Sequence, residues 1–161
     1  MKLLRPLMAV SVVLALTLTA LAAEGVPLKG VFGTNFQIVP LSPGVISAPV
    51  TGSGIVSQLG FATVSITQII DFTILPAPNQ TGTFTITAAN GDTLSGTVLG
   101  TALPPNQNNM ATFSGTMTIN AGTGRFQGVT GSLLYSGMAN LNTLQGTFSM
   151  GGTVSSPGSI K

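Results

Sequence analysis

The stretch ATFSGTMTINAGTGRFQGVT, residues 111–130, combines one strand, a glycine-rich turn and the beginning of a second strand. In its first half, Phe113, Gly115, Met117 and Ile119 share one face, while threonine, serine and asparagine occupy the other. Period-two alternation of this kind predicts a sheet with one buried face and one face in water. The chain after residue 24 repeats the same order of alternation, turn and alternation, so this stretch decides the fold class.

The turn within this stretch spans residues 122–128. Gly122, Gly124 and Gly128 can adopt the positive φ values that a tight reversal requires. The turn also holds Arg125, for which two interpretations remain open. Arg125 is either an anion clamp assisted by backbone N–H groups of the turn, or a structural group that ties loop carbonyls beside Phe126 at the end of the sheet. A phosphate loop is not predicted, because no Lys-Ser/Thr pair and no helix follow.

Further alternating segments on both sides predict short strands that are separated by proline and glycine. We expect strands at residues 30–39, 45–50, 55–59, 61–72, 81–89, 93–101, 111–120, 129–138 and 144–154. Residues 52–54, Gly-Ser-Gly, are interpreted as a turn, and residues 75–80 as a loop. Asn90 and Gly91 are predicted as turn residues of a hairpin, because both tolerate the positive φ of a type I′ turn.

The composition supports an all-β fold. Only 5% of the residues are charged, against about 25% in typical soluble domains, so the charged stripes that solvate long helices are missing. Eight or nine antiparallel strands must close into a barrel or fold into a sandwich to hide their edges. Small residues on the apolar faces suit strong bending, which favours the barrel. We therefore predict a closed antiparallel barrel of about eight strands over residues 30–154. A membrane-spanning barrel is the alternative, although the chain lacks the aromatic girdles of that class.

The first 22 residues have the features of a signal peptide: a positive start at Lys2 and Arg5, an apolar run over residues 7–19, and Ala-Leu-Ala at residues 20–22. We predict cleavage after Ala22, with Ala23 as the alternative. Residues 23–29 then lead into the first strand, and residues 155–161 form a flexible tail. An uncleaved membrane anchor is the other interpretation of this segment. The protein is therefore expected to be secreted or periplasmic.

Removal of the leader leaves a neutral chain. The formal charge of +2 includes Lys2 and Arg5, and the remaining charged residues balance one another. A neutral chain without a basic patch is unsuited to nucleic acid binding. Low net charge also weakens repulsion between copies, which leaves a homo-oligomer open.

The residues that most catalytic schemes need are missing. The chain has no His and no Cys, which excludes Ser-His-Asp and Cys-His catalysis, disulfides and His- or Cys-based metal sites. We expect no cofactor and no metal. The only acidic residues are Glu24, Asp71 and Asp92, and we interpret Asp71 and Asp92 as turn or cap residues. The lack of these residues favours a protein that is not an enzyme.

Three segments carry a family resemblance: AANGDTL at residues 88–94, AGTGRFQGVTGS at residues 121–132 and GSGIVSQLG at residues 52–60. They resemble the allene oxide cyclase barrel-like secreted proteins, mostly bacterial relatives of plant dirigent proteins and allene oxide cyclases. The resemblance implies a calycin-like antiparallel barrel of eight strands with a central cavity, and it implies little about activity. Members often carry Thr-His-Leu-Gly where this chain has Ser-Gln-Leu-Gly at residues 57–60, so any role of that histidine is absent. No catalytic residue is carried over.

Three functional hypotheses follow. The first is an exported, non-catalytic barrel that binds a small hydrophobic molecule in its lumen, with Arg125, Tyr135, Phe84 and Phe113 as candidate ligand-binding residues. The second is a surface or structural protein that self-associates through neutral, threonine-rich strands. The third is a dirigent-like or cyclase-like isomerase. Neither nucleic acid binding nor stable membrane insertion after leader removal is expected.

Overall fold

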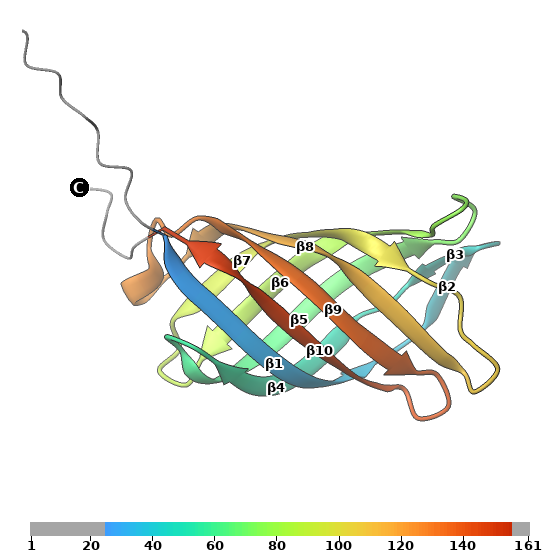
Figure 1. Ribbon diagram of the computed structural model, residues 1–161, viewed down its shortest axis with the longest axis horizontal. Coiled ribbons are helices and arrows are strands. Elements are labelled where there is room, and N and C mark those ends of the chain that lie inside the picture. The colour runs from blue at the N-terminus through green and yellow to red at the C-terminus, as the bar shows by residue number, and fades with distance from the viewer. Residues whose placement is uncertain (1–24, 156–161) are drawn as a thin grey trace, which may run out of the picture.

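Pairing between the first and last strands closes the sheet of this protein into a barrel (Figure 1). The computed structural model describes residues 25–155; the predicted signal peptide and nearly all of the predicted tail lie outside the described residues. Eight antiparallel strands make the wall: β1 (Val26–Phe36), β4 (Val50–Val56), β5 (Gly60–Asp71), β6 (Asn79–Ala88), β7 (Thr93–Ala102), β8 (Met110–Gly122), β9 (Gly131–Asn140) and β10 (Gln145–Val154). The predicted all-β closed barrel is thus confirmed.

Two short strands, β2 (Val39–Ser42) and β3 (Val45–Ser47), continue β1 and β4 beyond one end of the barrel. The long hairpin that they complete is held across its break by a hydrogen bond from the Gln37 N–H to the Pro49 carbonyl (3.0 Å). A second hydrogen bond, from the Ala48 N–H to the Gln68 carbonyl of β5 (2.9 Å), joins the break between β3 and β4 to the barrel wall. Figure 1 shows the β2–β3 tip projecting at the end opposite the starting point of β1. We call the end with β2 and β3 the open end, and the other the closed end.

Side chains alternate between the lumen and the outside along every wall strand, as period-two patterning requires. In β8, Met117 and Ile119 are buried inside, while Thr118 and Asn120 are exposed. The outer face carries mostly threonine, serine, asparagine and glutamine. A membrane-spanning barrel has the reverse arrangement, with apolar residues facing outward.

Inward-facing glycines lie directly opposite large inward side chains on neighbouring strands. Gly54 pairs with Phe32, and Gly96 pairs with Phe84. A Cβ atom at Gly54 would lie only 2.9 Å from the ring of Phe32 and would collide with the Val31 carbonyl oxygen. Small barrels fill their interior by alternating small and large residues in this way.

The interpretation of residues 52–54 as a turn is therefore wrong, as is a separate strand at residues 55–59. Gly52 and Gly54 both lie inside β4, where the lack of a side chain allows the neighbouring strand to approach closely. The reversal comes at residues 57–59 instead, with Gln58 at φ 68° and Gly60 at φ 75°. The loop predicted at residues 75–80 is also too long, because β6 begins at Asn79.

The hairpin predicted at Asn90-Gly91 is confirmed, but its turn is not type I′. Only Gly91 has a positive φ, of 88°. The Gly91 N–H donates to the Ala88 carbonyl (2.9 Å) and the Ala88 N–H donates to the Asp92 carbonyl (2.9 Å). This pattern is the three-residue loop in which a glycine follows a type I turn.

A short 3-10 helix, η1 (Gly124–Phe126), covers the closed end between β8 and β9. Phe126 is 4% exposed and belongs to the main core, which also includes the fully buried Val129. Within the described part of the chain, no helix is long and apolar enough to cross a membrane.

Candidate functional site

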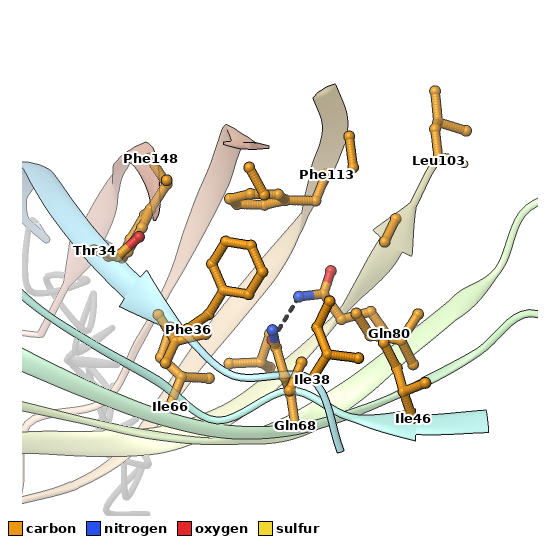
Figure 2. A pocket seen from close by; sticks show the side chains of 18 of the residues that line it. Thr34, Phe36, Ile38, Ile46, Ile66, Gln68, Gln80, Leu103, Phe113 and Phe148 are labelled. Carbon is orange, nitrogen blue, oxygen red and sulfur yellow. Dashed lines mark hydrogen bonds between the residues drawn. The ribbon is translucent and has the colours of Figure 1, made fainter. Parts of the chain in front are cut away.

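The lumen is hollow toward the open end, where it contains a cavity of about 280 Å³. The cavity wall is formed almost entirely by aliphatic and aromatic side chains from the wall strands and from the β2–β3 extension. Figure 2 labels the following apolar residues of the cavity wall: Phe36, Ile38, Ile46, Ile66, Leu103, Phe113 and Phe148. Ligand pockets in proteins are usually about 300–1,000 Å³ and largely apolar, so this cavity has the usual character and a volume just below that range.

The closed half of the lumen is packed solid beneath the cavity. The rings of Phe32 and Phe148 stack with centroids 5.1 Å apart. Below them the core contains fully buried aliphatic side chains, Ile86, Leu94 and Ile119 among them. A ligand would therefore enter from the open end.

A row of four residues brings two polar side chains together across the wall. Tyr135 of β9 lies opposite Gly115 of β8, which lies opposite Gly100 of β7, which lies opposite Gln80 of β6. Because the two intervening residues have no side chains, the phenol can extend along the wall, and its hydroxyl donates to Gln80 Oε1 at 3.1 Å. A Cβ atom at Gly100 would collide with the Tyr135 hydroxyl.

Gln68 of β5 extends this polar chain into the cavity. Gln80 Nε2 donates to Gln68 Oε1 at 2.6 Å. Figure 2 shows the two amides pointing toward each other, with Phe36 beside them. Gln68, Gln80 and Tyr135 are 7%, 3% and 6% exposed and all line the cavity. We call these three residues the polar triad.

Burial raises the pKa of the Tyr135 hydroxyl well above its ordinary value of 10.0. The phenol therefore keeps its proton and acts as a donor within the triad. The other residues that line the cavity include no Asp, Glu, Lys or Arg. Among the described residues, no group of three metal-ligating side chains is present.

The sequence-based candidate ligand residues separate into two places. Tyr135 and Phe113 line the cavity, with ring centroids 6.2 Å apart. Phe84 is 2% exposed and packs in the core rather than on the cavity wall. Arg125 lies at the closed end, beyond the packed core.

At the closed end, Arg125 contacts residues of the β6–β7 hairpin. Its Nε is 3.5 Å from Asp92 Oδ2, its backbone N–H donates to the same oxygen at 3.4 Å, and its guanidinium lies 4.8 Å from the Phe126 ring centroid. Asn90 also donates to Asp92 Oδ2, at 2.9 Å. These contacts tie η1 to the hairpin, and Gly124 at φ 56° lets the chain approach Asp92 closely.

Asp71 lies at the end of β5, near the open end, so the two carboxylates of the described chain occupy opposite ends of the barrel. Asp71 Oδ1 accepts hydrogen bonds from the Thr73 hydroxyl (2.6 Å) and the Thr73 N–H (2.9 Å). These bonds lower the pKa of Asp71. The geometry is that of a local turn.

The sequence interpretation missed Gln68 and Gln80 as site residues. Gln68 follows Ala62, Val64 and Ile66 on the inward face of β5, and this polar residue at a core position was the available signal. The prolines before it place Gln80 in a loop on sequence grounds, and a residue assigned to a loop gives no sign that its side chain faces inward.

Comparison of the chain with protein-family models, with curated proteins and with solved structures finds no match. The resemblance described above therefore remains a prediction, and the case for function depends on the barrel and its cavity.

Proposed function

We propose that this protein is an exported, non-catalytic barrel that binds a small hydrophobic molecule in its lumen. The observation that carries the proposal is the apolar cavity of about 280 Å³ beneath the open end. An eight-stranded barrel has an interior wide enough to hold one small ligand. Removing apolar surface from water on binding is favourable by about 25 cal/mol per Å².

A binding role is favoured over catalysis because the cavity wall has no acid–base group that ionises near neutral pH. Its one titratable side chain is Tyr135, whose raised pKa keeps it protonated. General acid–base catalysis works best when the pKa of the group is near the operating pH. A dirigent-like or cyclase-like isomerase would therefore have only neutral amides and one phenol to work with.

Export is supported by the signal-peptide features of residues 1–22, and the relation to allene oxide cyclase barrel-like proteins is part of the same proposal. The threonine-rich exterior supports a barrel that works in water after leader removal, because lipid-facing barrels carry an apolar outer band. The amino-terminal sequence of the protein recovered outside the cytoplasm tests the leader. It should begin at Ala23 or Glu24.

Native mass spectrometry of the mature protein, purified gently from its own host, tests ligand binding. We expect a discrete adduct of at most a few hundred daltons that organic solvent releases. If the measured mass is that of the protein alone, even after incubation with host lipid extract, the proposal is contradicted. The matched control is protein that has been unfolded by heat to release any bound ligand and then refolded. It should show no adduct until host lipid extract is added.

A second candidate function, self-association at a surface, is favoured by one feature of the exterior. Val31, Ile55 and Phe61 lie directly opposite one another on β1, β4 and β5, all facing outward. Their side chains are 61%, 64% and 54% exposed. We call these three residues the outer apolar row, and a second copy of the chain could bury its side chains on association.

A further inference from the structure

We propose that the ligand is a neutral, largely apolar molecule with one carbonyl-type oxygen, and that the side-chain amide of Gln68 donates a hydrogen bond to that oxygen. The inference rests on the proposed function, since it names the chemical class that the same cavity would take. It starts from the polar triad, because three polar side chains within an apolar lumen need an explanation.

The direction of the hydrogen bonds in the triad leaves donors facing the cavity. The Tyr135 hydroxyl donates to Gln80 Oε1, and Gln80 Nε2 donates to Gln68 Oε1, so each amide oxygen already accepts one bond. An amide Nε2 carries two N–H donors. Among the described residues, no acceptor is matched to Gln68 Nε2.

The free donors of Gln68 point into space that a ligand can reach. Within the described part of the chain, no fully buried side-chain nitrogen or oxygen lacks a partner, so Gln68 Nε2 retains accessible surface. Gln68 is only 7% exposed and lines the cavity, so the cavity supplies that surface. Leaving a donor unsatisfied when an apolar ligand excludes water costs about 1–3 kcal/mol. A ligand with an oxygen acceptor avoids this cost.

The absence of charged side chains from the cavity wall decides what kind of oxygen fits. A carboxylate would be buried without a cation, which is strongly unfavourable in an apolar site. An ammonium group would likewise be buried without a counter-ion, which is unfavourable for the same reason. A ketone, aldehyde or ester oxygen accepts without carrying charge, and the apolar wall contacts the rest of the molecule.

The wall holds the triad in place before any ligand arrives. Gly100 and Gly115 leave the space that Tyr135 occupies, and Tyr135 in turn fixes the amide orientation of Gln80. The 2.6 Å bond then fixes Gln68. Donors that are ordered in advance lose little conformational entropy on binding.

Three aromatic probes of similar size test the inference by calorimetry on the mature protein: butyrophenone, butylbenzene and phenylbutyrate at neutral pH. A cavity of this volume holds on the order of ten non-hydrogen atoms, given about 30 Å³ per water in the liquid. We expect butyrophenone to bind about fivefold more tightly than butylbenzene, which corresponds to one net hydrogen bond. We expect phenylbutyrate to bind at least tenfold more weakly than butyrophenone.

Two variants locate the donor. Gln68→Met keeps the side-chain length but removes the amide. We expect this variant to bind butyrophenone and butylbenzene with about equal affinity. Thr34→Val removes the one polar side chain of the cavity wall that lies outside the polar triad; loss of the preference in this variant alone would overturn the assignment to Gln68. Thermal melts of both variants establish that each is folded.

The outcomes separate this inference from the proposed function. If wild-type protein binds butylbenzene as tightly as butyrophenone, or if phenylbutyrate binds best, the cavity is a hydrophobic site and the carbonyl inference is wrong. These comparisons need no variant, so a Gln68→Met protein that failed to fold would leave the test intact. If none of the three probes binds, the proposed function itself fails.

Discussion

At the scale of single residues, Tyr135 shows how a polar group can be kept in an apolar lumen. Its hydroxyl is buried but donates to Gln80, so the cost of removing it from water is offset by a hydrogen bond. Tyr135 is also the only tyrosine of the chain, which has no tryptophan. Its absorbance and fluorescence therefore report on the triad alone.

The burial of Tyr135 should make the stability of the folded protein depend on pH in the alkaline range. Burial raises the pKa of the folded state above the ordinary value of 10.0, so the folded chain keeps a proton that the unfolded chain loses. The contribution of Tyr135 to the free energy of unfolding is therefore fully present below pH ~10 and declines as the pH rises beyond it. We expect tyrosinate absorbance to stay low above pH ~10 in native protein and to appear near pH ~10 in denaturant.

Tyr135→Phe is the control for this titration, because it removes the ionising group and keeps the ring. The variant should lose stability more slowly than wild type as the pH rises above ~10. Ionisation near pH ~10 in protein that circular dichroism shows to be folded would mean that the hydroxyl is open to solvent.

The sequence could indicate Tyr135 as a site residue but not its partners, for a physical reason. A tyrosine in an alternating segment has one polar atom at the end of a long side chain, so a hydrogen-bonding role can be expected from its chemistry. The side chains of Gln68 and Gln80 meet in a hydrogen bond between neighbouring strands. That meeting depends on the strand register, and register is set by the whole barrel rather than by local pattern.

At the scale of strands, the pairing of glycine with aromatic residues determines how tightly the wall can coil. Gly54 faces the lumen opposite Phe32, while Gly33 on the neighbouring strand faces outward into open space. The two glycines lie on paired strands and differ mainly in which side of the wall they face. They therefore form a matched pair for testing the packing of the lumen.

We expect Gly54→Ala to lower the free energy of unfolding by about 1–3 kcal/mol, because its Cβ atom would lie 2.9 Å from the ring of Phe32 and collide with the Val31 carbonyl. Gly33→Ala should be neutral or stabilising by up to about 1 kcal/mol, because its Cβ meets nothing within 4 Å and alanine loses less entropy than glycine. Urea denaturation followed by circular dichroism measures both. Equal effects in the two variants would show that the inward position has no special packing demand.

Strand patterns were predictable here, but glycines within strands were not. Residues 52–54 have the composition of a turn, and local chemistry favours that interpretation. The barrel places them in a strand because neighbouring backbones approach too closely for a side chain. The actual reversal uses Gln58 at positive φ, which is uncommon for a residue other than glycine and has no strong sequence signal. Asn90-Gly91, by contrast, combines two local turn signals, and its hairpin was found.

At the scale of the whole molecule, the two ends of the barrel have different roles. The closed end is packed by Phe126 and its neighbours, and the contact between Arg125 and Asp92 joins η1 to the β6–β7 hairpin. The open end is extended by β2 and β3 and contains the cavity. The packed closed end can stabilise the barrel while the other end stays hollow, which is what the proposed binding function needs.

The outer apolar row is the surface through which we expect copies of the protein to associate. The three side chains lie in register across β1, β4 and β5 on an exterior that is otherwise mostly polar. Leu134 on β9 is 70% exposed but lies between Thr116 and Gly151 on the paired strands. Apolar contact between copies should therefore depend on the row and not on Leu134, because adjoining apolar side chains bury more surface together than single ones.

Sedimentation velocity over a wide concentration range measures this. We expect wild-type mature protein to show reversible, concentration-dependent association, because its neutral surface offers little charge repulsion. Ile55→Thr combined with Phe61→Thr should shift the association to at least tenfold higher concentration, whereas Leu134→Thr should leave it unchanged. Threonine is β-branched and suits an exposed strand position, so both variants should fold. A wild-type protein that stays monomeric at the highest concentration would remove the self-association function and leave ligand binding as the only proposal for this barrel.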